Sequence, residues 1–258
     1  MLLAMDAGNT QIVCGCMEED RLRKSFRLPT RPGRTREETL AELRQGLKTW
    51  GLAPADFRGA VVSSVVPPVT GVLREAAEAL LGKPCLVIGP ELETGMPVCI
   101  DEPESLGADL LAGAVAAKER CGVPCIVLDL GTATTVTAVD GEGRFRGGAI
   151  LPGVKLSFRA LTAGTSLLPG LSLDRAPERV LGANTEDCLL SGAIYGSAAA
   201  LDGLIERMEE ELGSPCRCVA TGGIARHIVP YCRREIRLDE ELLFHGLWLL
   251  WQRNRPGD

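Results

Sequence analysis

The sequence is poor in the residues that many enzyme classes depend on. It has only two histidines, His227 and His245, and aromatic residues make up 4 % of its 258 positions. It contains no Gly-x-Ser-x-Gly elbow, so a Ser-His-Asp hydrolase has little support. It also has no P-loop of the form Gly-x4-Gly-Lys-[Ser/Thr] and no Gly-x-Gly-x-x-Gly after the first apolar run. Any nucleotide site must therefore be built from other residues.

The ten cysteines form neither a disulfide framework nor a metal-binding pattern. No two of them are spaced as Cys-x2-Cys, and the two histidines complete no ligand set with them. Most lie in apolar runs that are typical of strands, where a reduced thiol behaves as a small hydrophobic side chain. We therefore expect reduced, structural cysteines, as is usual in the cytosol.

Charge and hydropathy limit the partners. The formal net charge is −6 at pH 7, the opposite of the basic excess that marks a nucleic-acid binder. No apolar run approaches the roughly 20 residues that span a bilayer, and Asp6 interrupts the first run too early for a secretory signal. We expect a cytoplasmic protein with neither a nucleic-acid nor a membrane partner.

One pattern occurs twice. An apolar run ends in Asp6-Ala7-Gly8-Asn9-Thr10 near the start, and another ends in Asp129-Leu130-Gly131-Thr132 at the start of the second half. Apolar residues continue beyond both, which predicts a strand, a tight polar turn and a second strand. Glycine lets a ligand approach the backbone, the next amides and hydroxyls can bind phosphate oxygens, and the aspartate can hold an accompanying cation. An ordinary hairpin explains one copy; two copies favour two similar domains facing each other across a nucleotide.

The remaining pattern is that of an α/β protein. Leucines recur at helical spacing over Arg36–Trp50, with Thr35 as a candidate N-cap. Gly59–Val66 reads as a buried strand that Pro67 and Pro68 stop, and Val72–Leu81 as a helix. Further helices are expected over Leu156–Leu161, Glu186–Leu212 and Glu240–Arg253, and an irregular linker over Pro169–Pro177.

Three further features are candidates for function, and the first two have two interpretations each. Asp109 precedes the small-residue helix Ala112–Lys118, either as an acid favoured by the helix dipole or as a carboxylate that accepts a proton or orients a hydroxyl. The basic loop Leu28–Arg34 is either solvated or meets phosphate or an acidic partner. Gly222 and Gly223 follow a strand, where they suit backbone pressed against a base or ribose.

In their order, these motifs resemble those of the type III pantothenate kinases over essentially the whole chain. The stretches that carry the resemblance are Asp6–Thr10, Gly107–Asp109, Asp129–Thr135, Gly147–Gly153, Gly182–Thr185 with Ser191-Gly192, and Ala220–Gly223. The resemblance implies an α/β fold of two ribonuclease H-like domains of the acetate and sugar kinase/Hsc70/actin type, with the nucleotide in the interdomain cleft. We expect the domains to span 1–115 and 116–258.

The family resemblance also implies the activity. The family transfers the γ-phosphoryl group of ATP to pantothenate, the first step of coenzyme A biosynthesis, as a homodimer with Mg²⁺ and a monovalent cation, K⁺ or NH₄⁺. Asp109 would be the catalytic base, Asp129 would hold the monovalent cation, and Asp6 would hold Mg²⁺ through ATP. The implied nucleotide-binding residues are Asp6, Gly8, Asn9, Thr10, Thr132, Gly222 and Gly223. The implied pantothenate-binding residues are Gly107, Ala108, Asp109 and Thr185.

Three positions depart from the family pattern. Leu110 stands where arginine is usual, Thr137 where aspartate is, and Gly164 where a basic residue is. An arginine at 110 would pair with the pantothenate carboxylate, and leucine cannot replace such a charge-assisted hydrogen bond of roughly 1.5–3 kcal/mol. Lys155 or Arg159 is a candidate replacement. Two alternatives stay open: a catalytically silent member that binds nucleotide and acts through a partner, and a kinase for another hydroxylated molecule.

Overall fold

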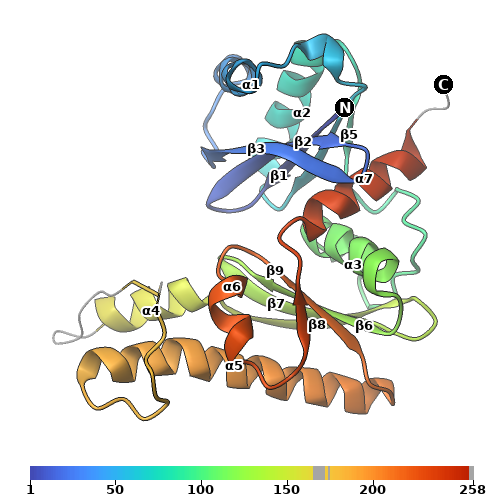
Figure 1. Ribbon diagram of the computed structural model, residues 1–258. Coiled ribbons are helices and arrows are strands. Elements are labelled where there is room, and N and C mark those ends of the chain that lie inside the picture. The colour runs from blue at the N-terminus through green and yellow to red at the C-terminus, as the bar shows by residue number, and fades with distance from the viewer. Residues whose placement is uncertain (165–171, 174, 256–258) are drawn as a thin grey trace. The chain divides into compact units, whose positions relative to one another are not determined.

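The computed structural model describes residues 1–164, 172–173 and 175–255 (Figure 1). Its contacts group the chain into two compact units. Unit 1 contains residues 1–97 and 101–116 together with the C-terminal segment from 241, and unit 2 contains 98–100 and 117–240. The expected division into 1–115 and 116–258 assigns the C-terminal helix to the second domain. In the structure this helix packs in unit 1. Residues 169–171 and 174 of the linker expected over 169–177 lie outside the described residues.

Unit 1 is built on a five-stranded sheet in the order β3-β2-β1-β4-β5. Strands β1, β2 and β3 form an antiparallel meander, and β4 and β5 continue the sheet parallel to β1. The bounds are β1 (Leu2–Ala7), β2 (Gln11–Glu18), β3 (Arg21–Pro29), β4 (Ala60–Ser64) and β5 (Cys85–Val87). Five of the six β1 side chains are apolar and fully buried, and four of these form the unbroken apolar run before Asp6.

Helices α1 (Arg36–Trp50) and α2 (Pro67–Leu81) cover one face of this sheet, and α7 (Leu242–Asn254) packs on the other (Figure 1). Thr35 caps α1 in a capping box with Glu38, which confirms the predicted helix start. The helix α2 begins at Pro67 rather than Val72. Proline fits the first helical turn because its missing N–H needs no partner there, so the two prolines that end the strand also begin the helix.

Unit 2 repeats the strand directions of unit 1. Its sheet has the order β10-β9-β6-β7-β8, with β6, β7 and β8 antiparallel and β9 and β10 parallel to β6. The bounds are β6 (Cys125–Leu130), β7 (Ala133–Val139), β8 (Phe145–Pro152), β9 (Arg217–Thr221) and β10 (Ile236–Leu238). The repeated motif in the sequence thus corresponds to a repeated sheet topology.

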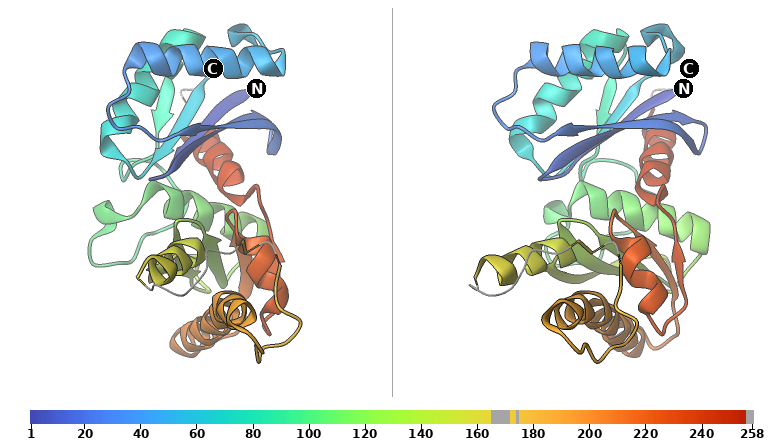
Figure 2. Two further views of the ribbon diagram at one scale, coloured as in Figure 1. Left: turned by 90° about the vertical axis from the view of Figure 1, so that its left-hand side faces the viewer. Right: turned by 60° about the vertical axis from the view of Figure 1, so that its left-hand side comes forward.

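The long helix α5 (Thr185–Leu212) runs along the unit 2 sheet in Figure 1, and the left view of Figure 2 shows it nearly end-on. It buries Leu190, Ile194, Ala198, Leu201 and Ile205 in the core beside Ile126 and Leu128, at the spacing of one helix face. By length and composition alone α5 could cross a membrane, but a core helix of a soluble protein passes the same test. Its apolar side is explained by this packing.

The remaining helices are short, except for α3. The helix α3 (Ala108–Cys121) begins in unit 1, and the Cβ that is missing from Gly246 of α7 would lie 2.0 Å from the Ala112 carbonyl oxygen. These two helices therefore pack backbone to backbone. The others are α4 (Val154–Ala163), α6 (Ala225–Ile228), η1 (Pro54–Asp56), η2 (Pro103–Ser105) and η3 (Val229–Tyr231).

Candidate active site

The first Asp-x-Gly motif forms the turn between β1 and β2. Asp6, half-buried, pairs with Val13 on β2 and with Ser63 on β4, one residue before β1 ends. The Gly8 N–H donates to the Gln11 carbonyl oxygen at 3.0 Å and closes the turn. Asn9 and Thr10 are exposed at its tip. The predicted strand–turn–strand is confirmed, with a carboxylate at its base and polar side chains facing solvent.

The second motif repeats this arrangement between β6 and β7. Asp129 is half-buried and pairs with Thr135 on β7 and Thr221 on β9. The Gly131 N–H donates to the Ala133 carbonyl oxygen at 3.0 Å, and Thr132 is exposed at the tip. Each unit therefore presents one turn with the same order of carboxylate, glycine and hydroxyl or amide side chain.

Gly222 lies against the base of the second turn. A Cβ at Gly222 would lie 2.5 Å from Asp129 Oδ1 and 2.7 Å from the Leu130 backbone, and its φ is +94°. Both the contact and the left-handed φ require glycine. A Cβ at the neighbouring Gly223 would meet no atom within 4 Å. The structure therefore brings Gly222 beside Asp129, a relationship that the sequence did not predict.

Asp109 lies in the first turn of α3. Its Oδ1 accepts a hydrogen bond from the Leu110 N–H at 2.8 Å, so the carboxylate lies at the positive end of the helix dipole. A Cβ at Gly107 would lie 2.6 Å from the same oxygen. Burial raises the pKa of Asp109, and its backbone hydrogen bonds only partly oppose that rise. This is the electrostatic setting of a general base, and equally of a partly buried helix acid.

The other predicted residues are distributed between the units. Ala108 is buried beside Asp109 in unit 1. Thr185 is exposed at the start of α5 in unit 2, where the Asn184 side chain caps the helix by accepting from the Asp187 N–H at 2.9 Å. Unit 1 thus contains Asp6, Gly8, Asn9, Thr10, Gly107, Ala108 and Asp109, and unit 2 contains Asp129, Thr132, Thr185, Gly222 and Gly223.

The three departures from the family pattern have different settings. Leu110 is half-buried directly after Asp109. Thr137 is buried in β7, and a Cβ at Gly148 would lie 2.8 Å from its Cα, so this position is tightly packed. Gly164 follows the last turn of α4. On the same helix, Lys155 and Arg159 are both exposed.

Gly153, part of a motif to which no role was assigned, shapes the second turn. Its N–H donates to the Thr132 carbonyl oxygen at 3.1 Å, and a Cβ there would lie 2.2 Å from that oxygen. The sequence did contain a signal for this contact, because Pro152-Gly153 ends the strand that follows the hairpin. The reason for the glycine is visible only in the folded chain.

The carboxylates of the candidate site suit a cation that is also bound by phosphate oxygens. Within the described ranges (1–164, 172–173 and 175–255), no group of three or more His, Cys, Asp or Glu side chains is arranged to hold a metal ion. Asp6 and Asp129 each provide one carboxylate at a strand end, beside a turn of backbone amides. Mg²⁺ commonly binds through one or two carboxylates together with substrate phosphates, and these residues fit that mode.

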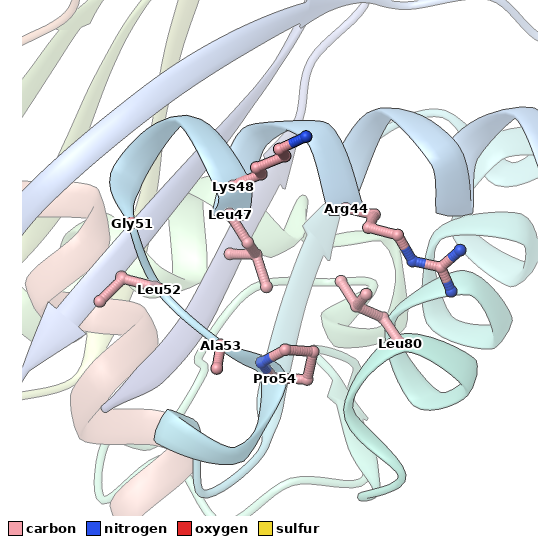
Figure 3. A pocket seen from close by; sticks show the side chains of 8 residues that line it. All are labelled: Arg44, Leu47, Lys48, Gly51, Leu52, Ala53, Pro54 and Leu80. Carbon is pink, nitrogen blue, oxygen red and sulfur yellow. The ribbon is translucent and has the colours of Figure 1, made fainter.

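Two hollows in the described surface lie away from these residues. One of about 370 Å³ lies between the end of α1 and α2, with a mainly apolar lining and Arg44 and Lys48 at its edge (Figure 3). Another, of about 690 Å³, lies between the β7–β8 hairpin and α5. Neither is lined by Asp6, Asp109 or Asp129, so we do not assign the chemistry to them.

Comparison with known proteins identifies full-length relatives. The model of the type III pantothenate kinase family matches residues 2–207. A type III pantothenate kinase of Rubrobacter xylanophilus is 45 % identical, and the alignment covers 98 % of each chain. Another, of Moorella thermoacetica, is 41 % identical over 98 % of this chain and 100 % of its own.

Solved structures support the fold. A putative Baf family transcriptional activator of Campylobacter jejuni matches with a TM-score of 0.58 at 18 % identity, covering 98 % of each chain. The (R)-2-hydroxyglutaryl-CoA dehydratase component A of Acidaminococcus fermentans matches with a TM-score of 0.58 at 13 % identity, covering 96 % of this chain and 95 % of its own. At such identities the likeness shows the fold alone. With the two repeated sheets, it confirms the α/β fold of the acetate and sugar kinase/Hsc70/actin type.

Proposed function

This chain belongs to the type III pantothenate kinase family, and from that premise we propose that it transfers the γ-phosphoryl group of ATP to pantothenate. The product, 4′-phosphopantothenate, is that of the first step of coenzyme A biosynthesis. The observation that carries the proposal is the paired Asp-x-Gly turn, one at the end of β1 and one at the end of β6. We place this activity in the cytoplasm.

The two turns would bind the nucleotide. Gly8, Asn9 and Thr10 would contact the phosphates in unit 1, and Thr132 would do so in unit 2, because exposed amides and hydroxyls at a tight turn suit phosphate oxygens. Gly222 and Gly223 would lie near the adenosine. Phosphoryl transfer needs mainly positioning and charge neutralisation, which is the chemistry that such turns supply.

The two aspartates would act through cations. A carboxylate repels phosphate, so Asp6 and Asp129 can assist only where a positive ion lies between the two groups. Asp6 would hold Mg²⁺ through ATP, and Asp129 would hold a monovalent cation, K⁺ or NH₄⁺. Bound in this way, Mg²⁺ neutralises charge on the transferring phosphoryl group. The single carboxylate at the end of β1 and of β6 supports a mode of binding in which protein and phosphate each provide ligands to the cation.

Asp109 would accept the proton of the terminal pantothenate hydroxyl, or orient that hydroxyl for attack. Burial raises its pKa, which makes the carboxylate a stronger base than an exposed aspartate. Gly107, Ala108 and Thr185 would contact pantothenate. Gly107 supports such a contact because it has no side chain beside Asp109 Oδ1.

We further propose a homodimer. Unit 2 exposes large apolar side chains, among them Ile150 (74 % exposed) and Leu181 (87 % exposed), and exposed apolar groups favour a protein contact. Leu181 lies four positions before Thr185, so such a contact would lie near the proposed pantothenate site. Light scattering should show a dimer that Leu181→Asp weakens and that Leu238→Asp, a leucine 41 % exposed on β10, leaves intact. A wild-type monomer would contradict the proposal.

The decisive experiment is a kinase assay. Purified protein is incubated with Mg-ATP, K⁺ and pantothenate, with and without Asp109→Asn, and 4′-phosphopantothenate is measured directly. We expect product from the natural chain and almost none from the variant. ATP binding without turnover of any acceptor would instead support a catalytically silent member.

Leu110 makes the choice of acceptor a second question for the same assay. With no arginine beside Asp109, the pantothenate carboxylate needs another cation, and the exposed Lys155 and Arg159 are the candidates. Leu110→Arg should lower the KM for pantothenate, and Arg159→Glu should raise it if that residue has taken the role. Phosphorylation of other hydroxylated acceptors, without any of pantothenate, would overturn the pantothenate assignment.

A further inference from the structure

The third strand of each unit is tied to the turn of the same unit. In unit 1, β3 ends at Pro29, and the N–H of the next residue, Thr30, donates to the Thr10 carbonyl oxygen at 3.1 Å. In unit 2, β8 ends at Pro152, and the Gly153 N–H donates to the Thr132 carbonyl oxygen at 3.1 Å. The same bond recurs at the same place in both units, so it belongs to the architecture of the turn.

The side chain at this position differs between the units. Position 153 has no room for one, since a Cβ would lie 2.2 Å from the Thr132 carbonyl oxygen and 2.6 Å from that of Gly131. Thr30 has room, and its hydroxyl donates a 2.6 Å hydrogen bond to the Gly8 carbonyl oxygen. In unit 1 a single residue therefore holds two carbonyl groups of the turn, those of Gly8 and Thr10.

The loop that carries Thr30 is fixed at its other end as well. The Arg34 side chain is 5 % exposed, and its Nη1 pairs with Glu42 Oε2 of α1 at 2.6 Å. The next residue, Thr35, accepts from the Glu38 N–H at 3.2 Å and donates its own N–H to Glu38 Oε2 at 2.9 Å. Thr30 is thus held between the start of α1 and the turn, and is not part of a freely solvated loop.

We propose that Thr30 is a positioning residue for the phosphates of ATP, a role that rests on the proposed kinase function. A trans peptide is planar, with its C=O and N–H pointing in opposite directions. When the Thr30 hydroxyl holds the Gly8 carbonyl, it also directs the Asn9 N–H of that peptide away from Thr30. Thr30 itself would touch no substrate; it fixes the direction in which the turn presents its amides.

Removal of the hydroxyl tests this role. Thr30→Val keeps the shape of the side chain but loses the donor, and Thr30→Ser keeps the donor. Thr49→Val is the matched control, because the Thr49 hydroxyl donates to the Gln45 carbonyl oxygen of its own helix, α1, at 3.0 Å. Steady-state kinetics with each substrate varied, calorimetric titration with Mg-ATP alone, and thermal unfolding are compared for all four proteins.

Thr30→Val should raise both the KM and the Kd for ATP about five- to tenfold, the range expected for one hydrogen bond. The KM for pantothenate should change less than twofold, Thr30→Ser should restore ATP binding, and Thr49→Val should behave like the natural chain. A Thr30→Val protein that binds ATP within twofold of the natural chain, or that changes both KM values equally, overturns the proposal.

The other possible outcomes also test the proposed role of Thr30. If Thr30→Val does not fold, Thr30→Ala replaces it, and loss of folding in both makes Thr30 a structural residue and overturns the proposal. If the natural chain binds Mg-ATP but does not phosphorylate pantothenate, the proposed function fails while the Kd comparison still decides the role of Thr30. A natural chain that does not bind Mg-ATP overturns both.

Discussion

Gly222 is packed against Asp129 so closely that a Cβ at position 222 would lie 2.5 Å from the carboxylate oxygen Oδ1. Parallel pairing of β6 with β9 sets Thr221 opposite Asp129, so the residue that follows β9 passes over the carboxylate. Gly222 thereby limits where the Asp129 side chain can lie, and with it where a cation held by that carboxylate would bind.

Gly222→Ala should therefore displace the Asp129 carboxylate. The alanine Cβ would clash with the Asp129 carboxylate, and a φ of +94° is unfavourable for alanine. We therefore expect a loss of about 1–3 kcal/mol in the free energy of unfolding. More K⁺ should also be needed for half-maximal activity. Thermal unfolding and K⁺ titration of the kinase assay measure these two effects.

Gly141→Ala is the control for that prediction, since a Cβ at Gly141 would meet no atom within 4 Å and the residue lies outside the proposed nucleotide site. It should change both measurements little. If the two alanine variants behave alike, Gly222 does not shape the Asp129 site.

The sequence predicts the local parts of this site well and the contacts between distant segments poorly. The two turns, and the start of α1 at Thr35, follow from short patterns that bring their own hydrogen bonds. The placement of Gly222 beside Asp129 depends on which strands pair, and no local pattern encodes that pairing. Residue 153 likewise reads as an ordinary turn glycine until the Thr132 carbonyl lies against it.

The helices also show that the sequence predicts contacts between distant segments poorly. The apolar face of the last helix predicts a buried position but does not specify the core, and α7 packs in unit 1 although it follows unit 2 along the chain. Pro67 and Pro68 read as the end of a strand, yet α2 begins at Pro67. The two prolines both follow the strand and begin the helix, and the sequence pattern indicated only the end of the strand.

The cysteines should be largely unreactive in the folded protein. Burial raises the pKa of Cys125 and Cys218 to about 12 each, so almost no thiolate is present at neutral pH. Cys99 and Cys188 are the exposed thiols among the described residues. We expect a thiol reagent at pH 7.5 to modify these two rapidly in the native protein and all ten after denaturation. Mass spectrometry of the labelled peptides identifies the sites, and rapid native labelling of Cys125 or Cys218 would contradict the prediction.

Asp140 should stabilise the β7–β8 hairpin above its pKa. Burial opposes ionisation, but hydrogen bonds from the Arg144 backbone and from the Arg144 and Arg146 guanidinium groups lower its pKa to about 2. A lowered folded pKa gives stability that is present above the unfolded value of 3.8 and is lost as the pH falls towards 2. Because both arginines are partly exposed, solvent screening leaves about 1–2 kcal/mol.

Asp140→Asn should therefore lower the free energy of unfolding at pH 7 and reduce its decline between pH 4 and pH 2, as measured by denaturant titration across that range. The exposed Glu142 also pairs with Arg144, at 2.7 Å, and Glu142→Gln provides the control because exposed ion pairs contribute little. Equal effects of the two substitutions would show that burial of Asp140 is unimportant.

The pKa of Asp109 is shifted in the opposite direction to that of Asp140. Substitution of Asp109 should therefore affect catalysis and stability differently. Burial raises its folded pKa above the ordinary 3.8, so the folded chain holds this proton to higher pH than the unfolded chain does. The contribution of the carboxyl group to stability is then greatest at low pH, and it falls as the pH rises through the raised pKa. At neutral pH the ionised, partly buried carboxylate costs stability.

Asp109→Asn should consequently be at least as stable as the natural chain at pH 7 while it loses most of its kinase activity. Asparagine can still accept the hydrogen bond from the Leu110 N–H, so the start of α3 should remain intact, and the two proteins should converge in stability at low pH. Glu104→Gln, at an exposed acid in η2, should change neither property. Parallel measurement of kcat and of the free energy of unfolding from pH 4 to pH 8 tests both. An Asp109→Asn protein that keeps its activity, or that unfolds more readily at pH 7, would assign Asp109 to the structure of the helix rather than to proton transfer.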